Sequence, residues 1–203
     1  MLGPMSWLTR LGFVSPGGAE DPAALLGEAA AGDAAAQTRL YRRESGPVFR
    51  YLLALGSDEA LALDAMQDAF VELLRAPAGF NPQLGTLGAY LAGIARHRWL
   101  ARCREARRFV EATPDDETDA PVALAAADLS EHIACRQLQG SVWAGIRQLS
   151  WTQREALVLV DLQERPYREA AAIAGVSEDV LRTRLHRART RLATVLGAQG
   201  VRP

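Results

Sequence analysis

Aromatic residues and strand-like runs are scarce in this sequence. Only 6% of the 203 residues are aromatic, and the β-branched or aromatic runs between turn residues that predict strands are missing. Alanine and leucine dominate instead, and 49% of the residues are hydrophobic, which is sufficient for a packed core. The composition therefore predicts an all-α protein with one large or two small domains.

Cysteine and long apolar runs are scarce as well. Cys103 and Cys135 are the two cysteines, and neither lies in a CxxC motif or a His/Cys cluster, so a disulfide framework and a zinc site are not indicated. No stretch approaches the apolar length of a membrane span, and residues 1–14 lack the features of a cleaved signal peptide. We therefore expect a cytoplasmic protein without membrane insertion or bound metal.

Lysine is absent, so all 23 basic residues are arginine. This bias is typical of GC-rich coding, and arginine also suits bidentate contacts with phosphates and guanine. With 24 acidic residues the formal net charge is −1, which argues against a protein that coats nucleic acid everywhere. The positions of the arginines are therefore more informative than their number.

Turn residues and charge divide the sequence into four segments. The N-terminal extension, residues 1–22, ends in a stretch rich in proline and glycine. The first helical domain covers residues 23–108 and is interrupted by the glycine- and proline-rich loop 77–88. Residues 109–130 are acidic and contain two prolines, which predicts a flexible linker. Residues 131–198 form the second helical domain.

The second domain has the spacing of a helix-turn-helix. A short alanine-rich helix begins at Tyr167, Gly175 stands at the tight turn, and Ser177 is placed as the N-cap of the next helix. Apolar residues recur along one face of that next helix, which must therefore pack inward. They are Leu181, Leu185, Ala188 and Leu192.

The outward face of this last helix is rich in arginine. It carries no carboxylate between Val180 and Leu192, so it suits a DNA major groove, where arginine reads guanine edges or binds phosphates. A solvated face on an ordinary bundle helix looks the same, and the segment alone does not distinguish the two. The outward basic residues are Arg182, Arg184, His186, Arg187, Arg189 and Arg191.

Residues 149–177, continued by 181–189, resemble region 4 of the extracytoplasmic-function (ECF) sigma factors of the sigma-70 family. The match covers most of residues 146–196 and implies a domain that binds the −35 promoter element. A Ser-Trp pair at 150–151 and a Val-Leu pair at 180–181 depart from the family pattern, which affects base preference rather than fold. By position, the expected −35 contacts are Ser177, Arg182, Thr183, Arg184, His186 and Arg187.

The first domain resembles region 2 of the same family. Residues 62–74 carry the acid and amide pattern of its region 2.2, with Phe70 on the opposite, apolar face. Alone, this pattern is more typical of a solvated face, but the two motifs in order favour a docking surface. In the family this face binds the coiled coil of the polymerase β′ subunit. The residues expected to bind the polymerase are Asp64, Gln67, Asp68 and Val71.

Residues 90–108 resemble regions 2.3 and 2.4, which meet the −10 element. Six arginines accompany a single acid, Glu105, and this excess is typical of a nucleic-acid surface. Trp99 is a candidate for stacking on exposed bases, whereas Tyr90 is expected in the core. The loop 77–88 lies where the family captures a base during strand opening. The candidate −10 contacts are Phe80, Asn81, Arg96, His97, Trp99 and Arg104.

Three functional classes follow from these patterns. A sigma factor is favoured, and the resemblance implies a non-enzymatic subunit without cofactor that binds promoter DNA, core RNA polymerase (β′ coiled coil and β flap) and an anti-sigma factor. A stand-alone helix-turn-helix regulator would not need the polar face of residues 62–74. An enzyme is disfavoured because phosphate-binding loops, GxSxG and metal-ligand spacings are missing, and no catalytic residue is expected. The histidines also lie apart, at His97, His132 and His186.

Overall fold

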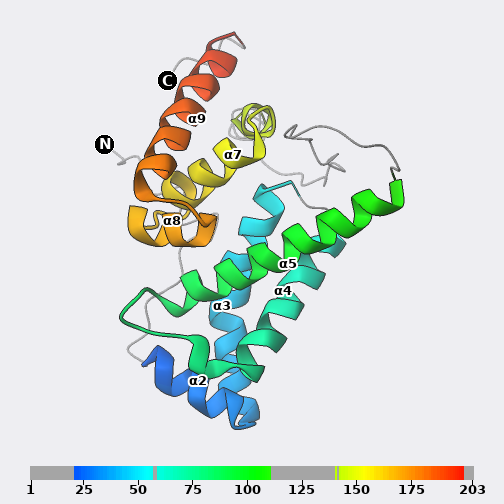
Figure 1. The fold of residues 1–203 in the computed structure, drawn as a ribbon, viewed down its shortest axis with the longest axis vertical. Helices are drawn as coiled ribbons and strands as arrows, with labels where there is room; N and C mark the ends of the chain where they lie inside the picture. Colours follow the sequence, from blue (N-terminus) through cyan, green and yellow to red (C-terminus); the bar gives the residue numbers. More distant parts are fainter. Residues whose placement is uncertain (1–20, 57–58, 111–139, 141, 199–203) are drawn as a thin grey trace.

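The computed structural model describes residues 21–56, 59–110, 140 and 142–198. These residues form helices joined by short loops, and no strand occurs among them. The predicted all-α class with two helical domains is confirmed (Figure 1). The predicted N-terminal extension, up to residue 20, and the predicted acidic linker, from residue 111 on, lie outside the described residues.

The first domain begins with two helices that aspartates cap. The Asp21 carboxylate accepts a hydrogen bond from the backbone amide two residues on, at 3.0 Å, and Asp33 accepts two such bonds, at 2.8 and 3.0 Å. Gly32, with φ of +99°, makes the turn between them. This break is not among the predicted ones, although Gly-Asp is a common turn signal. The elements are α2 (Pro22–Ala30), α3 (Ala34–Ala54), α4 (Glu59–Arg75), η1 (Pro77–Gly79) and α5 (Leu87–Val110).

The core of the first domain lies between α3, α4 and α5. The predicted apolar face of α4 is confirmed, because Met66, Phe70 and Leu73 are all buried there. Tyr51 of α3 and Leu91 of α5 are fully buried against this face. Each large apolar side chain removed from water stabilises the fold by roughly 1.5–3 kcal/mol, so the pairing of α4 with α5 fixes the polar face of α4 outward.

The second domain is shorter and contains a turn of π-helix. Residues 142–147 are helical, and the Ser150 hydroxyl, which accepts a bond from the Gln153 amide at 3.4 Å, caps the following helix. The apolar run that follows continues as the π-helical turn. The elements are α7 (Trp151–Leu157), η2 (Val158–Leu162), α8 (Tyr167–Ala174) and α9 (Glu178–Ala198).

The turn between α8 and α9 has the predicted helix-turn-helix chemistry. Gly175 adopts the left-handed conformation, with φ of +66° and ψ of +36°, that ends α8. The Ser177 hydroxyl accepts a bond from the Val180 amide at 3.3 Å, so the predicted N-cap is confirmed. The apolar stripe that begins at Leu181 and Leu185 is buried against α7 and α8. The opposite side of α9 therefore faces outward.

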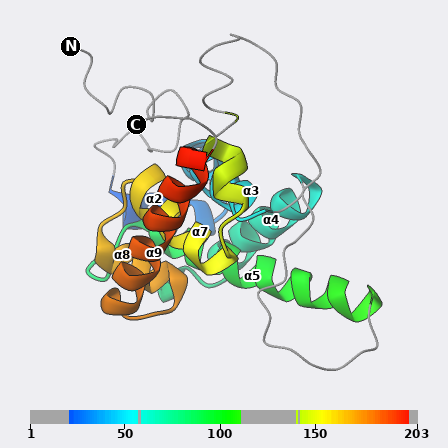
Figure 2. The same cartoon turned by 90° about the horizontal axis from the view of Figure 1, so that it is seen from above.

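The two domains pack against one another. In Figure 1 the second domain lies over α3 and the first half of α5, and contacts join α5 to α8 and α3 to η2. Figure 2 shows from above that the second half of α5 projects beyond this contact. One half of the arginine-rich helix is thus covered by the second domain, and the other half is not.

Candidate nucleic-acid and polymerase interfaces

The outward side of α9 presents several of the predicted −35 residues together. Thr183, His186 and Arg187 are exposed on successive turns. The Thr183 hydroxyl donates to the carbonyl of Asp179 at 2.9 Å, which fixes its rotamer along the helix. Ser177 is exposed at the start of the helix, where backbone amides point toward any bound anion.

Arg182 is exposed but engaged by its neighbours. Its guanidinium forms ion pairs of 2.9 Å with Glu178 and with Asp179, and it lies over the Tyr167 ring at 5.4 Å from the ring centre. The acid-free stretch that the sequence shows begins just after these two acids. To contact the −35 element, Arg182 must therefore break its ion pairs with Glu178 and Asp179.

Arg184 differs from the other predicted −35 residues. It is half-buried and lies near enough to Glu155 of α7 to lower the pKa of that carboxyl. Arg189, one turn further on, forms a 2.6 Å ion pair with Asp161 of η2. Arg184 is therefore partly covered by the body of the protein, and the exposed Arg189 is tied to η2 by an ion pair; periodicity on α9 alone reveals neither contact.

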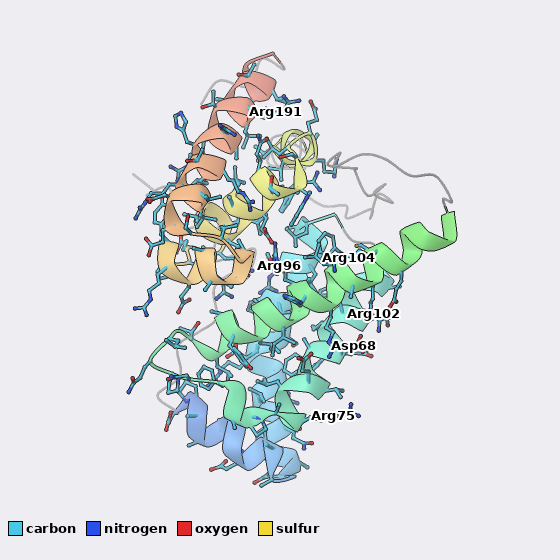
Figure 3. All side chains as sticks on the ribbon, viewed as in Figure 1. Asp68, Arg75, Arg96, Arg102, Arg104 and Arg191 are labelled. Atoms are coloured by element: carbon cyan, nitrogen blue, oxygen red, sulfur yellow. The ribbon has the colours of Figure 1, made fainter. Side chains whose placement is uncertain are left out.

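The polar face of α4 is available for a partner. Asp64 and Gln67 are exposed, and the Val71 side chain has an exposed fraction of 46% although it is apolar. Asp68 is half-buried because Arg102 of α5 binds it at 2.6 Å and also reaches Asp64 at 3.3 Å. Figure 3 shows Arg102 beside Asp68. The predicted polymerase-binding residues thus share one surface, but an arginine of α5 adds a positive charge to it.

Two of the predicted −10 residues are covered rather than exposed. The Trp99 ring is only 3% exposed, and its centre lies 6.4 Å from that of Trp151 in α7. The Arg96 side chain is 11% exposed, and its Nε lies 2.6 Å from Oε1 of Glu155; Figure 3 places it between the domains. In this arrangement Trp99 is not accessible to a base, because the second domain packs on that side of α5.

The other α5 candidates remain accessible. His97 and Arg104 are exposed. Arg98, between them, is tied to Glu72 of α4 by a 2.6 Å ion pair. The thiol of Cys103 nearby is free of any disulfide and half-buried, whereas Cys135 and His132 lie outside the described residues.

The loop before α5 borders a cavity of about 670 Å³. Phe80 packs on Tyr90 with ring centres 5.8 Å apart, so Tyr90 is only partly in the core. Asn81 is exposed, and its side-chain oxygen accepts a bond from the Gln83 amide at 2.9 Å. His97 of α5 and Ile173 of α8 also line the cavity. The cavity therefore belongs to both domains.

A buried acid joins the domains and was not predicted. Glu155 has no exposed surface; it accepts bonds from the Tyr51 hydroxyl at 2.9 Å and from Arg96 at 2.6 Å. Burial raises the pKa of Glu155, and the bonds from Arg96 and Tyr51 oppose that rise. Burial and the adjacent carboxylate raise the pKa of Tyr51 well above its usual range, so its hydroxyl stays protonated and donates. In the sequence Glu155 ends the polar stretch 152–155 and precedes the apolar run 156–160, so no local signal marks it as buried.

Within the residues that the structure describes, no group of three or more acidic, His or Cys side chains is placed to hold a metal ion. In the same part of the chain, no helix is long and apolar enough to cross a membrane.

Two family models match the chain, one in each domain. Residues 40–109 match the family model of Sigma-70 region 2, and residues 139–192 match that of Sigma-70, region 4. The ECF RNA polymerase sigma factor SigM of Mycobacterium tuberculosis is 30% identical over 196 residues, which cover 96% of this chain and 93% of the relative. The ECF RNA polymerase sigma factor BldN of Streptomyces coelicolor is 28% identical over 172 residues, covering 85% and 64%.

Solved structures share the fold. CnrH in complex with the cytosolic domain of CnrY has a TM-score of 0.62 at 24% identity and covers 88% of this chain and 99% of that one. The sigma factor RpoE in complex with the anti-sigma factor NepR from Bartonella quintana has a TM-score of 0.61 at 24% identity, with coverages of 79% and 96%.

Two helical domains, the second of which contains a helix-turn-helix, define the class of DNA-binding transcription factors. The family matches specify it further. The chain belongs to the ECF subfamily of the sigma-70 family of RNA polymerase sigma factors. It accordingly directs promoter-specific transcription initiation by RNA polymerase.

Proposed function

We propose that the exposed side of α9 binds the −35 element, that α5 and the loop before it bind the −10 element, and that the polar face of α4 binds core polymerase. The protein acts in the cytoplasm as a non-catalytic subunit, and RNA synthesis belongs to the polymerase. The single observation that carries this proposal is the exposed side of α9 from Thr183 onward, which carries no acid and on which Thr183, His186 and Arg187 lie together.

The promoter must be identified before any contact is tested. Run-off transcription with core polymerase on a library of genomic fragments maps the start sites and thereby both promoter elements. Arg187→Ala should then lower affinity for a mapped promoter by about 1–3 kcal/mol and relax selection at one base pair. Arg147→Ala, which removes an exposed arginine before α7, is the matched control. Unchanged promoter binding by Arg187→Ala and Arg182→Ala would reject the assignment of α9.

The −10 assignment rests on the cavity between the loop and α5. An unstacked base needs an aromatic face and polar groups at its edge, and Phe80, Tyr90, Asn81 and His97 line this cavity. Phe80→Ala should therefore slow strand opening more than it weakens binding to duplex promoter. Permanganate reactivity of thymines at the start site measures opening, and equal reactivity with the wild type would contradict the assignment.

Val71 gives the sharpest test of polymerase docking. It is the apolar, exposed member of the α4 face, and Val71→Lys introduces a positive charge without breaking an ion pair. Association with a basic partner should therefore weaken. Core-polymerase pull-down measures this, and it also separates a sigma factor from a stand-alone helix-turn-helix regulator.

Replacement of the α4 acids needs its own control. Asp64→Lys with Asp68→Lys should abolish holoenzyme, but it also places three cations together because Arg102 lies between them. Arg102→Gln removes the same ion pairs and leaves both acids in place. If Arg102→Gln binds polymerase normally and the double variant does not, the acids themselves form the dock; normal binding by both variants rejects it.

An anti-sigma factor is the proposed regulator. It is the partner of RpoE in the solved complex of that relative. Affinity capture of the full-length chain from its host, with mass spectrometry of the bound proteins, should yield core polymerase and one further small protein that competes with it. Recovery of polymerase alone would contradict this part of the proposal.

A further inference from the structure

Val180 is a large apolar residue that is exposed in the first turn of α9, with an exposed fraction of 42%. Its backbone amide donates to the hydroxyl of the Ser177 cap at 3.3 Å, and its neighbour Leu181 is fully buried. Because the cap and Leu181 fix this turn of the helix, Val180 cannot rotate inward. A valine in a helix also keeps essentially one side-chain rotamer. Its methyl groups are therefore held at a fixed position on the surface.

The stability of the fold does not account for a valine at this position. An exposed side chain gains little from the hydrophobic effect, and valine is a poorer helix former than alanine or glutamate because its rotamers are restricted. A single exposed apolar residue is nevertheless common on protein surfaces and indicates nothing alone. The surroundings of Val180 therefore decide whether it has a role in binding.

Val180 shares one side of α9 with two of the predicted −35 residues. Thr183 and Arg187 follow it by three and seven residues, so they lie on neighbouring turns of the same side, and both are exposed. The Thr183 hydroxyl already donates to the carbonyl of Asp179 at 2.9 Å, so it has no further proton to donate to a base. The start of this surface is therefore apolar, and the arginine comes after it.

The two acids that precede Val180 are directed away from it. The carboxylates of Glu178 and Asp179 each bind the Arg182 guanidinium at 2.9 Å. Two residues turn an α-helix by about 200°, so Arg182 lies on nearly the opposite side of α9 from Val180. The side that carries Val180 and Arg187 is therefore apolar and basic, which is the combination that a base edge beside a phosphate requires.

The first turns of the second helix in a helix-turn-helix are the part that contacts base edges in the major groove. A valine side chain has no donor or acceptor, so the feature that it can distinguish there is the C5-methyl group of thymine. We propose that Val180 selects a thymine in the −35 element by packing against that methyl group. This inference rests on the proposed binding of α9 to the −35 element, and it adds a specificity-determining residue that the sequence prediction omitted.

Replacement of thymine by uracil isolates this contact. Uracil lacks only the C5-methyl group and keeps every hydrogen-bonding group of the base pair, so contacts made by arginine are unaffected. Loss of one buried methyl-sized group should weaken binding roughly 4-fold. The rotamer of Val180 is already fixed, so little of this gain is spent on ordering the side chain.

The experiment uses holoenzyme formed from the full-length chain and core polymerase, with the promoter mapped by run-off transcription. Each thymine of the −35 element, on both strands, is replaced in turn by deoxyuridine, and affinity is measured by competition with a fluorescent promoter fragment. The wild type should lose roughly 4-fold at one position. Val180→Ala should bind the thymine promoter more weakly by a similar factor and should not distinguish thymine from uracil at that position.

Two further variants serve as controls on the same helix. Thr183→Ala should keep the preference for thymine over uracil at that position, since the methyl group is assigned to Val180 and not to Thr183. Thr194→Ala removes an exposed side chain at the other end of α9 and should change neither the affinity nor the preference. Thermal unfolding followed by circular dichroism checks that Val180→Ala is folded.

The inference is overturned if no thymine shows the loss, if Val180→Ala keeps the wild-type preference, or if the mapped −35 element contains no A·T pair. The proposed function is judged by other variants. If Arg187→Ala weakens promoter binding while Val180→Ala keeps the preference for thymine, the inference fails and the proposed function stands. If Arg187→Ala and Arg182→Ala both bind the promoter normally, the assignment of α9 fails, and the inference fails with it.

Discussion

Replacement of Arg154 by alanine should destabilise the second domain by about 3–5 kcal/mol, the usual loss when one partner of a buried charged network is removed. Its guanidinium is almost fully buried and donates to three carbonyls of its own domain, at 3.1 Å to Ile146, 2.7 Å to Arg147 and 3.1 Å to Leu149. The Ile146 and Arg147 carbonyls lie at the end of the helix over 142–147, where carbonyls lack an intrahelical partner, and Leu149 lies in the turn that follows.

The magnitude follows from these bonds. A hydrogen bond from a charged donor contributes about 1.5–3 kcal/mol, so three bonds within the domain give a sum above the expected loss. The full sum is not reached, because the smaller alanine admits water to some of the freed carbonyls. The fourth bond, to Leu55 of the first domain, adds to the effect only while the domains are in contact.

Urea unfolding followed by far-UV circular dichroism measures the loss. Arg154→Lys should lie between the wild type and alanine, because an ammonium group lacks the planar fork that reaches several carbonyls at once. Arg147→Ala removes an exposed arginine of the same segment and should stay within about 0.5 kcal/mol of the wild type. A loss below about 1 kcal/mol in Arg154→Ala would refute the view that this side chain closes the helix end.

Three further outcomes are expected from local structure. Gly175→Ala should destabilise by about 1–2 kcal/mol through its left-handed backbone alone, since the nearest atom to an added Cβ is 3.9 Å away; an unchanged melting temperature would contradict this. Ser177→Ala should cost about 1 kcal/mol through loss of the N-cap, measured by urea unfolding. The amides of Ala36 and Ala35 lower the pKa of Asp33 below 3.8, so its stabilisation is complete above that pH and lost as the pH falls through the lower, folded value. The difference in the free energy of unfolding between wild type and Asp33→Ala should accordingly fall toward zero at low pH, as measured by unfolding at a series of pH values.

Local patterns predicted the parts of the site that depend on a single helix. The apolar stripe of α9, Gly175 at the turn and the Ser177 cap follow from 3.6-residue periodicity and from capping chemistry, both of which act over a few residues. The two faces of α4 were predictable for the same reason, because Phe70 must pack inward and Val71, its neighbour, then points outward. These features need no knowledge of what lies elsewhere in the chain.

The contact between the domains was not predictable in this way. Arg96 and Trp99 lie on an arginine-rich helix that reads as a uniform nucleic-acid surface, and only the position of α7 decides which side of α5 is covered. The partner, Glu155, is 59 residues away in sequence from Arg96, and no periodicity links them. Glu155 ends the polar stretch 152–155, and that stretch indicates neither its burial nor the helix against which it packs.

Because α5 is longer than its contact with the second domain, its two halves differ in how accessible they are to nucleic acid in the free protein. The half near Arg96 is covered, whereas the projecting half, with Arg104, is open (Figure 2). A first encounter can involve only the open half, which offers few phosphate contacts and hence a shallow dependence of affinity on salt. If the second domain moved away from the covered half, more phosphates would be neutralised and the dependence of affinity on salt would steepen. The slope of log affinity against log salt concentration would thus measure how many phosphates α5 neutralises, and so whether one half or both halves of the helix contact DNA.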